Sequence, residues 1–153
     1  MRSIKIIAFT VLFQLALPIS ANAFCFEQAG AEFQIDPILL KAIAVHESRL
    51  NPATMAGNTN NTVDIGLMGI NTVHLRDRDL QTAGYSTQVL LDPCTNVRVG
   101  AWLLRKKITR WGETWRAVGA YHSETPEKNQ SYQWRVFRVY QGLKEKLFDS
   151  SRQ

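Results

Sequence analysis

HESRLNPATMAGNTNNTVDIGLMGIN, residues 46–71, joins the end of a predicted helix to a predicted extended segment. Pro52 and the asparagine before it predict a turn that ends the helix near Arg49. The polar run at 57–65 contains too many asparagine and threonine residues for a helix, so we expect a small hairpin or an irregular loop. Glu47 lies before this run, and Asp64 lies near its end. The stretch therefore predicts an acidic pair on either side of a loop.

Most of the chain outside this stretch predicts helices. Asp-Pro pairs, which combine an N-cap with a proline suited to the first helical position, precede apolar residues at helical spacing from 36 and again from 92. Gly112 predicts the end of the second of these helices. The predicted helices cover 36–48, 92–111, 113–122 and 129–148, with a further one at 25–33.

Glu47 continues the apolar stripe of the first helix, four residues beyond Ile43. Its carboxyl should point toward the core and lie in the last turn, where the helix dipole disfavours a negative charge. Both effects raise its pKa, and a carboxyl that keeps its proton near neutral pH can act as a general acid. The alternative is a surface pair with His46 or Arg49.

Asp64 lies in T-V-D-I-G, where the β-branched neighbours predict extended backbone. Gly66 predicts a point where the backbone packs closely against another part of the chain. A loop that folds back over the helix end would bring Asp64 near the floor of a cleft. Two carboxylates that flank a sugar linkage are the basis of most glycosidases. The alternative is that Asp64 caps its own turn.

A zinc-protease interpretation fails because His46 and Glu47 begin an H-E-x-x-H pattern that Leu50 does not complete. His74 and His122 show no metal-ligand spacing either. The sequence implies no metal and no organic cofactor.

Residues 1–23 are predicted to be a cleaved signal peptide, with a basic start, an apolar stretch and an A-x-A site at 21–23. About 130 residues then remain, which predicts a single domain over 24–153. We expect a monomer in the periplasm, without a stable membrane anchor. An uncleaved anchor is the alternative.

The chain has two cysteines, Cys25 and Cys94, and an even count in an oxidising compartment favours a disulfide over two buried thiols. Closing a loop of this length would stabilise the fold by roughly 4 kcal/mol.

The charge is mildly basic. Without Arg2 and Lys5 of the signal, 16 basic and 13 acidic residues leave a net charge of +3. Such a balance suits an anionic cell wall, membrane headgroups or nucleic acid. We expect no nucleic-acid binding, because the basic residues are dispersed and no recognition motif is present.

Several motifs, in this order, carry a resemblance to one family. They are E-S at 47–48, N-P-A-T at 51–54, D-I-G-L-M at 64–68, I-N at 70–71, D-P-C-x-N at 92–96 and A-Y at 120–121. From about Cys25 to Tyr140 the chain resembles the lysozyme-like lytic transglycosylases, or SLT family. It is most similar to the small secreted members associated with type III and type IV secretion and with conjugation.

The resemblance implies a mainly α, lysozyme-like α+β fold, in which a helical domain lies with a small β-hairpin or loop beside a glycan-binding cleft. The expected substrate is the glycan strand of peptidoglycan, and a secretion or conjugation component is an expected partner. Glu47 would be the catalytic acid, and Asp64 an additional catalytic carboxylate that many members lack. The substrate-binding residues would be Ser48, Met68, Asn71 and Tyr121. In particular, Tyr121 would reach the Glu47 carboxyl and Met68 would line the groove.

Two departures from the family pattern affect these expectations. The usual G-L-M-Q ends in Gly69, so an amide side chain expected to touch the glycan is absent. The usual A-Y-N-A-G continues after Tyr121 as His122, Ser123 and Glu124. Alternatives to a lytic transglycosylase that forms a 1,6-anhydro product are therefore a catalytically weak peptidoglycan-binding adaptor and a hydrolysing muramidase.

Overall fold

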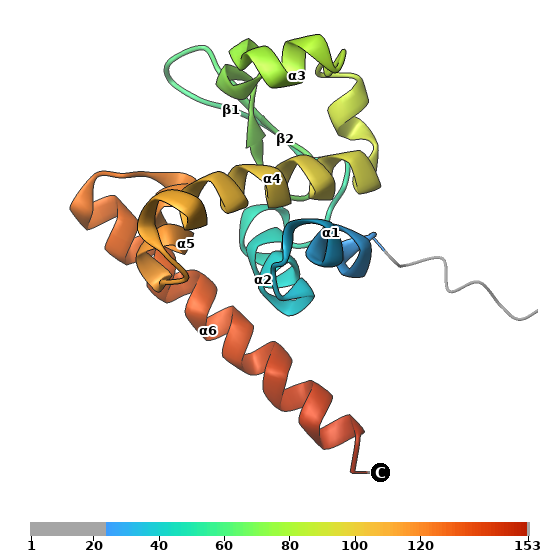
Figure 1. Cartoon of the computed structure of the whole chain (residues 1–153), viewed down its shortest axis with the longest axis vertical. Helices are drawn as coiled ribbons and strands as arrows, with labels where there is room; N and C mark the ends of the chain where they lie inside the picture. The colour runs from blue at the N-terminus through green and yellow to red at the C-terminus, as the bar shows by residue number, and fades with distance from the viewer. Residues whose placement is uncertain (1–23, 153) are drawn as a thin grey trace, which may run out of the picture.

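The helices are joined by one small sheet in the computed structural model, which describes residues 24–152 (Figure 1). The predicted signal peptide, 1–23, lies outside the described residues. The elements in chain order are α1 Phe26–Phe33, α2 Pro37–Ser48, β1 Met55–Gly57, β2 Val63–Ile65, β3 Ile70–Asn71, the 3-10 helix η1 Thr72–Arg76, α3 Arg78–Thr82, the 3-10 helix η2 Val89–Leu91, α4 Pro93–Trp111, α5 Trp115–His122 and α6 Pro126–Ser150. The predicted class, mainly helical with a small β element, is confirmed.

The predicted helix starts are confirmed in atomic detail. Asp36 Oδ1 accepts a 2.8 Å hydrogen bond from the backbone N–H of Ile38, and Asp92 Oδ1 accepts one of 2.8 Å from Thr95. Each cap satisfies a backbone donor that the first helical turn leaves free. The last helix begins at Pro126, earlier than the predicted 129, because proline suits the first helical position.

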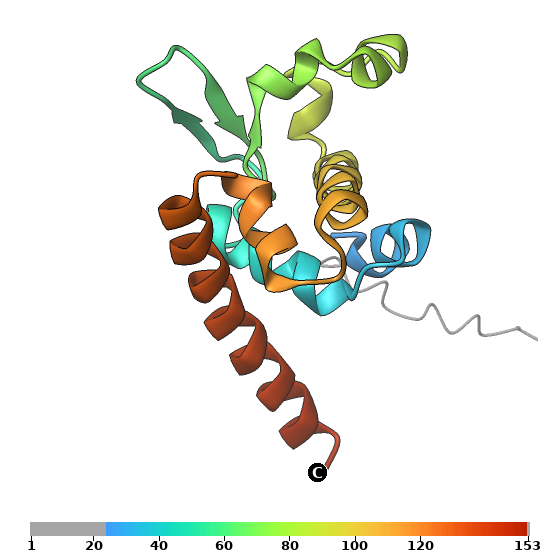
Figure 2. The same cartoon turned by 60° about the vertical axis from the view of Figure 1, so that its left-hand side comes forward.

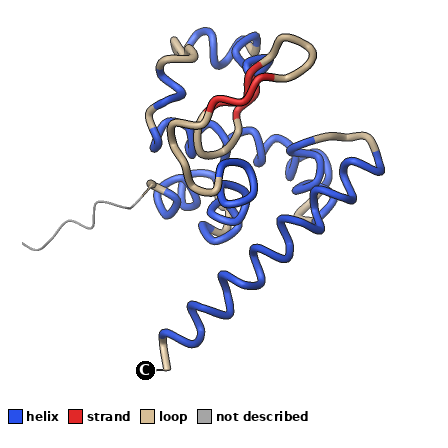
Figure 3. The backbone as a smooth tube through the Cα atoms, turned by 180° about the vertical axis from the view of Figure 1, so that it is seen from behind, coloured by secondary structure: helices blue, strands red, loops and turns tan. Residues whose placement is uncertain are grey.

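Helix α4 separates two regions of the molecule. The sheet and α3 lie on one side of it, and α1 and α2 lie on the other (Figure 1). Buried side chains of α2, α4 and α6 form one core, which includes Leu40, Ile43, Val97, Leu104 and Val136. The second half of α6 extends beyond the rest of the domain (Figures 2 and 3). In the part of the chain that is described, no helix has the length and apolar composition to cross a bilayer.

The polar run forms a hairpin, one of the two predicted alternatives. Strands β1, β2 and β3 form an antiparallel sheet in that order, with Asp64 opposite Asn71. The short elements between 72 and 91 were not predicted. They contain three to five residues each, too few to show a helical period in the sequence.

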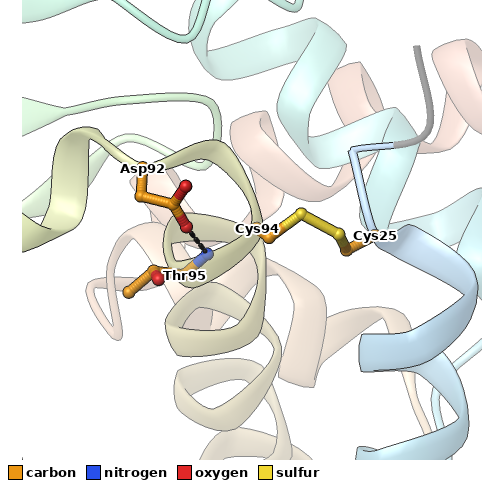
Figure 4. The surroundings of a disulfide bond; sticks show 4 residues. All are labelled: Cys25, Asp92, Cys94 and Thr95. Atoms are coloured by element: carbon orange, nitrogen blue, oxygen red, sulfur yellow. Dashed lines mark hydrogen bonds between the residues drawn. A yellow bond between two sulfur atoms is a disulfide. The ribbon is translucent and has the colours of Figure 1, made fainter. Parts of the chain in front are cut away.

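The predicted disulfide is confirmed. Cys25 and Cys94, with Cα atoms 5.2 Å apart, join the start of α1 to the first turn of α4 (Figure 4). The covalent loop contains the cleft-facing end of α2 and the whole sheet, because the two cysteines are 69 positions apart.

Candidate active site

A polar cleft of about 600 Å³ lies where the end of α2 meets the sheet, α5 and the start of α6. Glu47 and Asp64 both face it, so the loop brings together the two carboxylates of the sequence prediction. The other lining residues are Asn58, Thr59, Asn60, Thr62, Gly69, Ile70, Asn71, Val73, His74, Leu103, Lys107, Ala120, Tyr121, His122, Ser123, Glu124 and Lys128.

Glu47 is largely sheltered from water in the last turn of α2. Its pKa is raised to about 7, mainly by burial and also by the nearby negative charge of Asp64, while a hydrogen bond from Tyr132 and the charge of Arg135 act in the opposite direction. That bond runs from the Tyr132 hydroxyl to Oε1 of Glu47 over 2.5 Å. The pKa is raised in the predicted direction, and a value near neutral pH suits a general acid.

Asp64 lies on β2, opposite Asn71 on β3. The Asn71 amide donates to Asp64 Oδ1 over 2.7 Å and to Thr62 Oγ over 2.9 Å, while its own Oδ1 accepts from Val73 N–H. The Asp64 carboxylate is thus held by side-chain pairing across the sheet. It does not cap its own turn through any hydrogen bond among the described residues.

Ser48 and Met68 lie beneath the cleft. The Ser48 hydroxyl is within hydrogen-bond distance of Ala44 O (3.1 Å) and Leu67 O (2.9 Å), so it ties α2 to the loop before β3. The Met68 side chain is 0% exposed and packs against Gly100 of α4. The expectation that Met68 lines the groove is therefore wrong for its side chain, because the apolar thioether is drawn into the core.

The expectation that Tyr121 reaches the Glu47 carboxyl is also wrong. Its hydroxyl donates instead to the backbone carbonyl of Met68 over 2.8 Å. Burial raises the pKa of Tyr121 well above its usual value, and the charges of Glu47 and Asp64 add to the effect. The hydroxyl therefore stays protonated as a donor that fixes the loop at the cleft floor.

Tyr132, which bonds Glu47, is a candidate site residue that the sequence analysis does not identify. It lies on α6, and its side chain is 1% exposed. Its ring stacks on His122 with centroids 5.0 Å apart and meets His46 edge-on at 5.1 Å. A tyrosine on the apolar face of a helix needs a hydrogen-bond partner for its hydroxyl. That requirement is the sequence signal that could have pointed to Tyr132.

Asn96 of α4 holds the loop between β2 and β3 through hydrogen bonds. Its Oδ1 accepts from Met68 N–H over 2.7 Å, and its amide nitrogen donates to Ile65 O and Leu90 O over 2.8 and 2.9 Å. The side chain is 1% exposed, so the bonds form out of water. The asparagine of the D-P-C-x-N motif therefore joins α4 to both sides of the loop.

No group of three or more His, Cys, Asp or Glu side chains is placed to hold a metal ion among residues 24–152. The site consists of protein carboxyl, hydroxyl, amide and imidazole groups. His46 and His122 are neutral near pH 7, because burial lowers the pKa of each.

A helical domain with a small antiparallel sheet and a protonated glutamate in a polar cleft defines a lysozyme-like, glycan-cleaving enzyme. The family model described as Transglycosylase SLT domain matches residues 24–134. The chain belongs to this family and is a lytic transglycosylase.

Relatives of similar length support this assignment. The chain is 38% identical over 131 residues to "Invasion protein IagB" of Salmonella typhi, covering 82% of this chain and 81% of the relative. It is 36% identical over 129 residues to "Protein IpgF" of Shigella flexneri, covering 81% and 84%. It is 35% identical over 159 residues to "Peptidoglycan-binding-like protein" of Escherichia coli O157:H7, covering 95% of each.

Proposed function

We propose that this protein cleaves the β-1,4 linkage between N-acetylmuramic acid and N-acetylglucosamine in peptidoglycan and forms a 1,6-anhydro product. The observation that carries the proposal is Glu47, whose pKa of about 7 and place in the cleft suit a single carboxyl that acts first as acid and then as base.

In the first step, Glu47 donates its proton to the bridging oxygen as the bond to C1 of the muramic acid breaks. The N-acetyl oxygen of the same sugar traps the positive C1. Glu47, now a carboxylate, removes the proton of the 6-hydroxyl, and O6 bonds to C1 as the bond between C1 and the N-acetyl oxygen breaks. The proton that Glu47 lost is restored and no water is consumed, in line with the substrate-assisted exceptions to the two-carboxylate scheme.

The remaining site residues have supporting roles in this proposal. Asp64 stabilises the positive charge that develops on the sugar, and Asn71 holds Asp64 in place through the 2.7 Å bond. Ser48 and Tyr121 act through the backbone of the loop, at Leu67 and Met68. The polar hairpin side chains Asn58, Asn60 and Thr62 face the same cleft and offer hydrogen bonds to glycan hydroxyls.

The biological setting belongs to the same proposal. A cleaved signal at 1–23 would deliver the domain to the periplasm, where peptidoglycan lies. The resemblance to secretion- and conjugation-associated members suggests that it opens the wall locally for such an apparatus. One of the relatives bears the name of an invasion protein, in keeping with that role.

The test is digestion of purified sacculi by the mature chain and by Glu47→Gln, with exposed Glu145→Gln on α6 as the control. We expect soluble anhydro-muropeptides from the wild type and the control, and none from Glu47→Gln. Reducing-end products would identify a hydrolysing muramidase instead. Binding to sacculi without any soluble product would identify an adaptor.

A further inference from the structure

The two oxygens of the Glu47 carboxyl have different surroundings. Oε1 accepts the hydrogen bond from Tyr132. Oε2 has no hydrogen-bond partner among the described residues and lies against Gly69, which lines the cleft. Since Oε1 already accepts a hydrogen bond from the tyrosine hydroxyl, the carboxyl's own proton belongs on Oε2, the oxygen on the Gly69 side.

Gly69 leaves no room for a side chain at that oxygen. A Cβ built on it would lie 2.8 Å from Oε2 and 3.2 Å from both Cβ and Cδ of Glu47. The first distance is too short for a carbon next to an oxygen, so either the carboxyl or the loop would have to move. The backbone φ of +58° also favours glycine, and its N–H donates to Gly66 O over 3.3 Å.

We propose that Gly69 is a positioning residue for the general acid: its missing side chain leaves Oε2 as the uncovered, proton-donating oxygen of Glu47. This inference rests on the proposed function, in which Glu47 is the acid. It also gives a role to the departure from G-L-M-Q, which otherwise only removes a glycan contact.

The electrostatic consequence follows from the groups around the carboxyl. Tyr132 and Arg135 approach from α6, Asp64 from β2 and Tyr121 from α5. None of them donates a hydrogen bond to Oε2. A glutamine at position 69 would bring an amide donor close to that oxygen, and a donor stabilises the charged carboxylate. Glycine therefore helps to keep the carboxyl protonated as well as uncovered.

The first experiment is a double-mutant cycle on Tm, which requires no substrate. Gly69→Ala is made in the wild type and in Glu47→Ala, which removes the carboxyl atoms that the new methyl group would meet. Gly84→Ala is the control, because Gly84 has φ +74° but nothing within 4 Å of its Cβ position. We expect Gly69→Ala to lower Tm more in the wild type than in Glu47→Ala. Gly84→Ala should lower Tm by the same amount in both backgrounds.

If Gly69→Ala lowers Tm equally in the two backgrounds, or prevents folding in both, the inference is overturned. Backbone strain alone would then explain the loss of stability. Folding only in Glu47→Ala would support it. This coupling can be present even if the sacculus digest fails, so the two proposals are tested separately.

The second readout is kinetic. We expect Gly69→Ala to reduce kcat at least 10-fold with KM changed less than threefold, and Gly69→Gln to move the basic limb of the pH profile to lower pH. Wild-type kcat and an unchanged pH profile in both variants would contradict the positioning role.

Discussion

The hydroxyl of Tyr132 donates a 2.5 Å hydrogen bond to Oε1 of Glu47, across 85 positions of the chain. The bond joins the end of α2 to α6 and fixes which carboxyl oxygen is occupied. Because the tyrosine ring lies between His46 and His122, its hydroxyl has little freedom to leave. The orientation of the Glu47 carboxyl therefore depends on α6, the last helix of the chain.

Tyr132→Phe should reduce kcat roughly 10- to 100-fold, because the carboxyl loses the one side-chain hydrogen bond that it accepts within residues 24–152. The pKa of Glu47 should rise, since a donor to the charged form is removed, and the basic limb of the pH profile should move upward. The control is Tyr140→Phe, whose hydroxyl bonds Asp36 at the other end of α2. Steady-state kinetics on soluble glycan strands from pH 5 to 9 measure both effects. An unchanged profile would show that Tyr132 does not hold the acid.

The raised pKa of Glu47 also makes stability depend on pH. The folded chain binds this proton more tightly than the unfolded chain, so the stabilising contribution is complete below about pH 4.5 and is lost as pH rises to about 7. Relative to Glu47→Gln, the free energy of unfolding of the wild type should therefore fall by up to roughly 3 kcal/mol over this range.

Urea denaturation of both chains at several pH values measures the difference. The subtraction is needed because burial lowers the pKa of His46, His74 and His122, which gives the opposite slope in an overlapping range. A difference that does not change between pH 4.5 and 7 would mean that Glu47 ionises as freely as in the unfolded chain.

Asp64→Asn should lower kcat about 10-fold if the carboxylate stabilises positive charge on the sugar. The negative charge of Asp64 raises the pKa of Glu47. Removing that charge should therefore move the basic limb of the pH–activity profile to lower pH. The substitution keeps an oxygen for the Asn71 amide, and exposed Asp79→Asn is the control. The same kinetic series gives both values. A muramidase that uses Asp64 as nucleophile would instead lose essentially all activity.

Asn96→Ala should destabilise the fold by about 3 kcal/mol or more, because it leaves one backbone N–H and two carbonyls without their partner in the core. The loop that contains Met68 should become more mobile, because the Met68 N–H loses its acceptor. Activity should therefore fall at temperatures well below Tm. The comparison is Asn58→Ala in the exposed hairpin, which should change stability by no more than about 0.5 kcal/mol. Urea unfolding followed by circular dichroism gives both values, and equal costs would contradict the bracing role of Asn96.

Much of the fold could be predicted from local signals. The two Asp-Pro caps, the glycine after α4 and the polar hairpin each act within a few residues, and all are observed. The continuation of the α2 stripe to Glu47 correctly predicted a sheltered carboxyl, because side-chain direction in a helix follows from its period alone. The short elements between 72 and 91 were missed, since three to five residues are too few to show a helical period.

The sequence by itself determined that this chain has a mainly helical domain, a hairpin after the helix whose last turn holds a partly buried glutamate, and a pair of cysteines suited to a disulfide. Only the tertiary structure decided which tyrosine holds that glutamate: Tyr132 does, while Tyr121 and Met68 support the loop. The reason is physical. Helical period and capping are local properties of a few neighbouring residues, whereas the partner of a buried hydroxyl is chosen by how helices distant in sequence pack together.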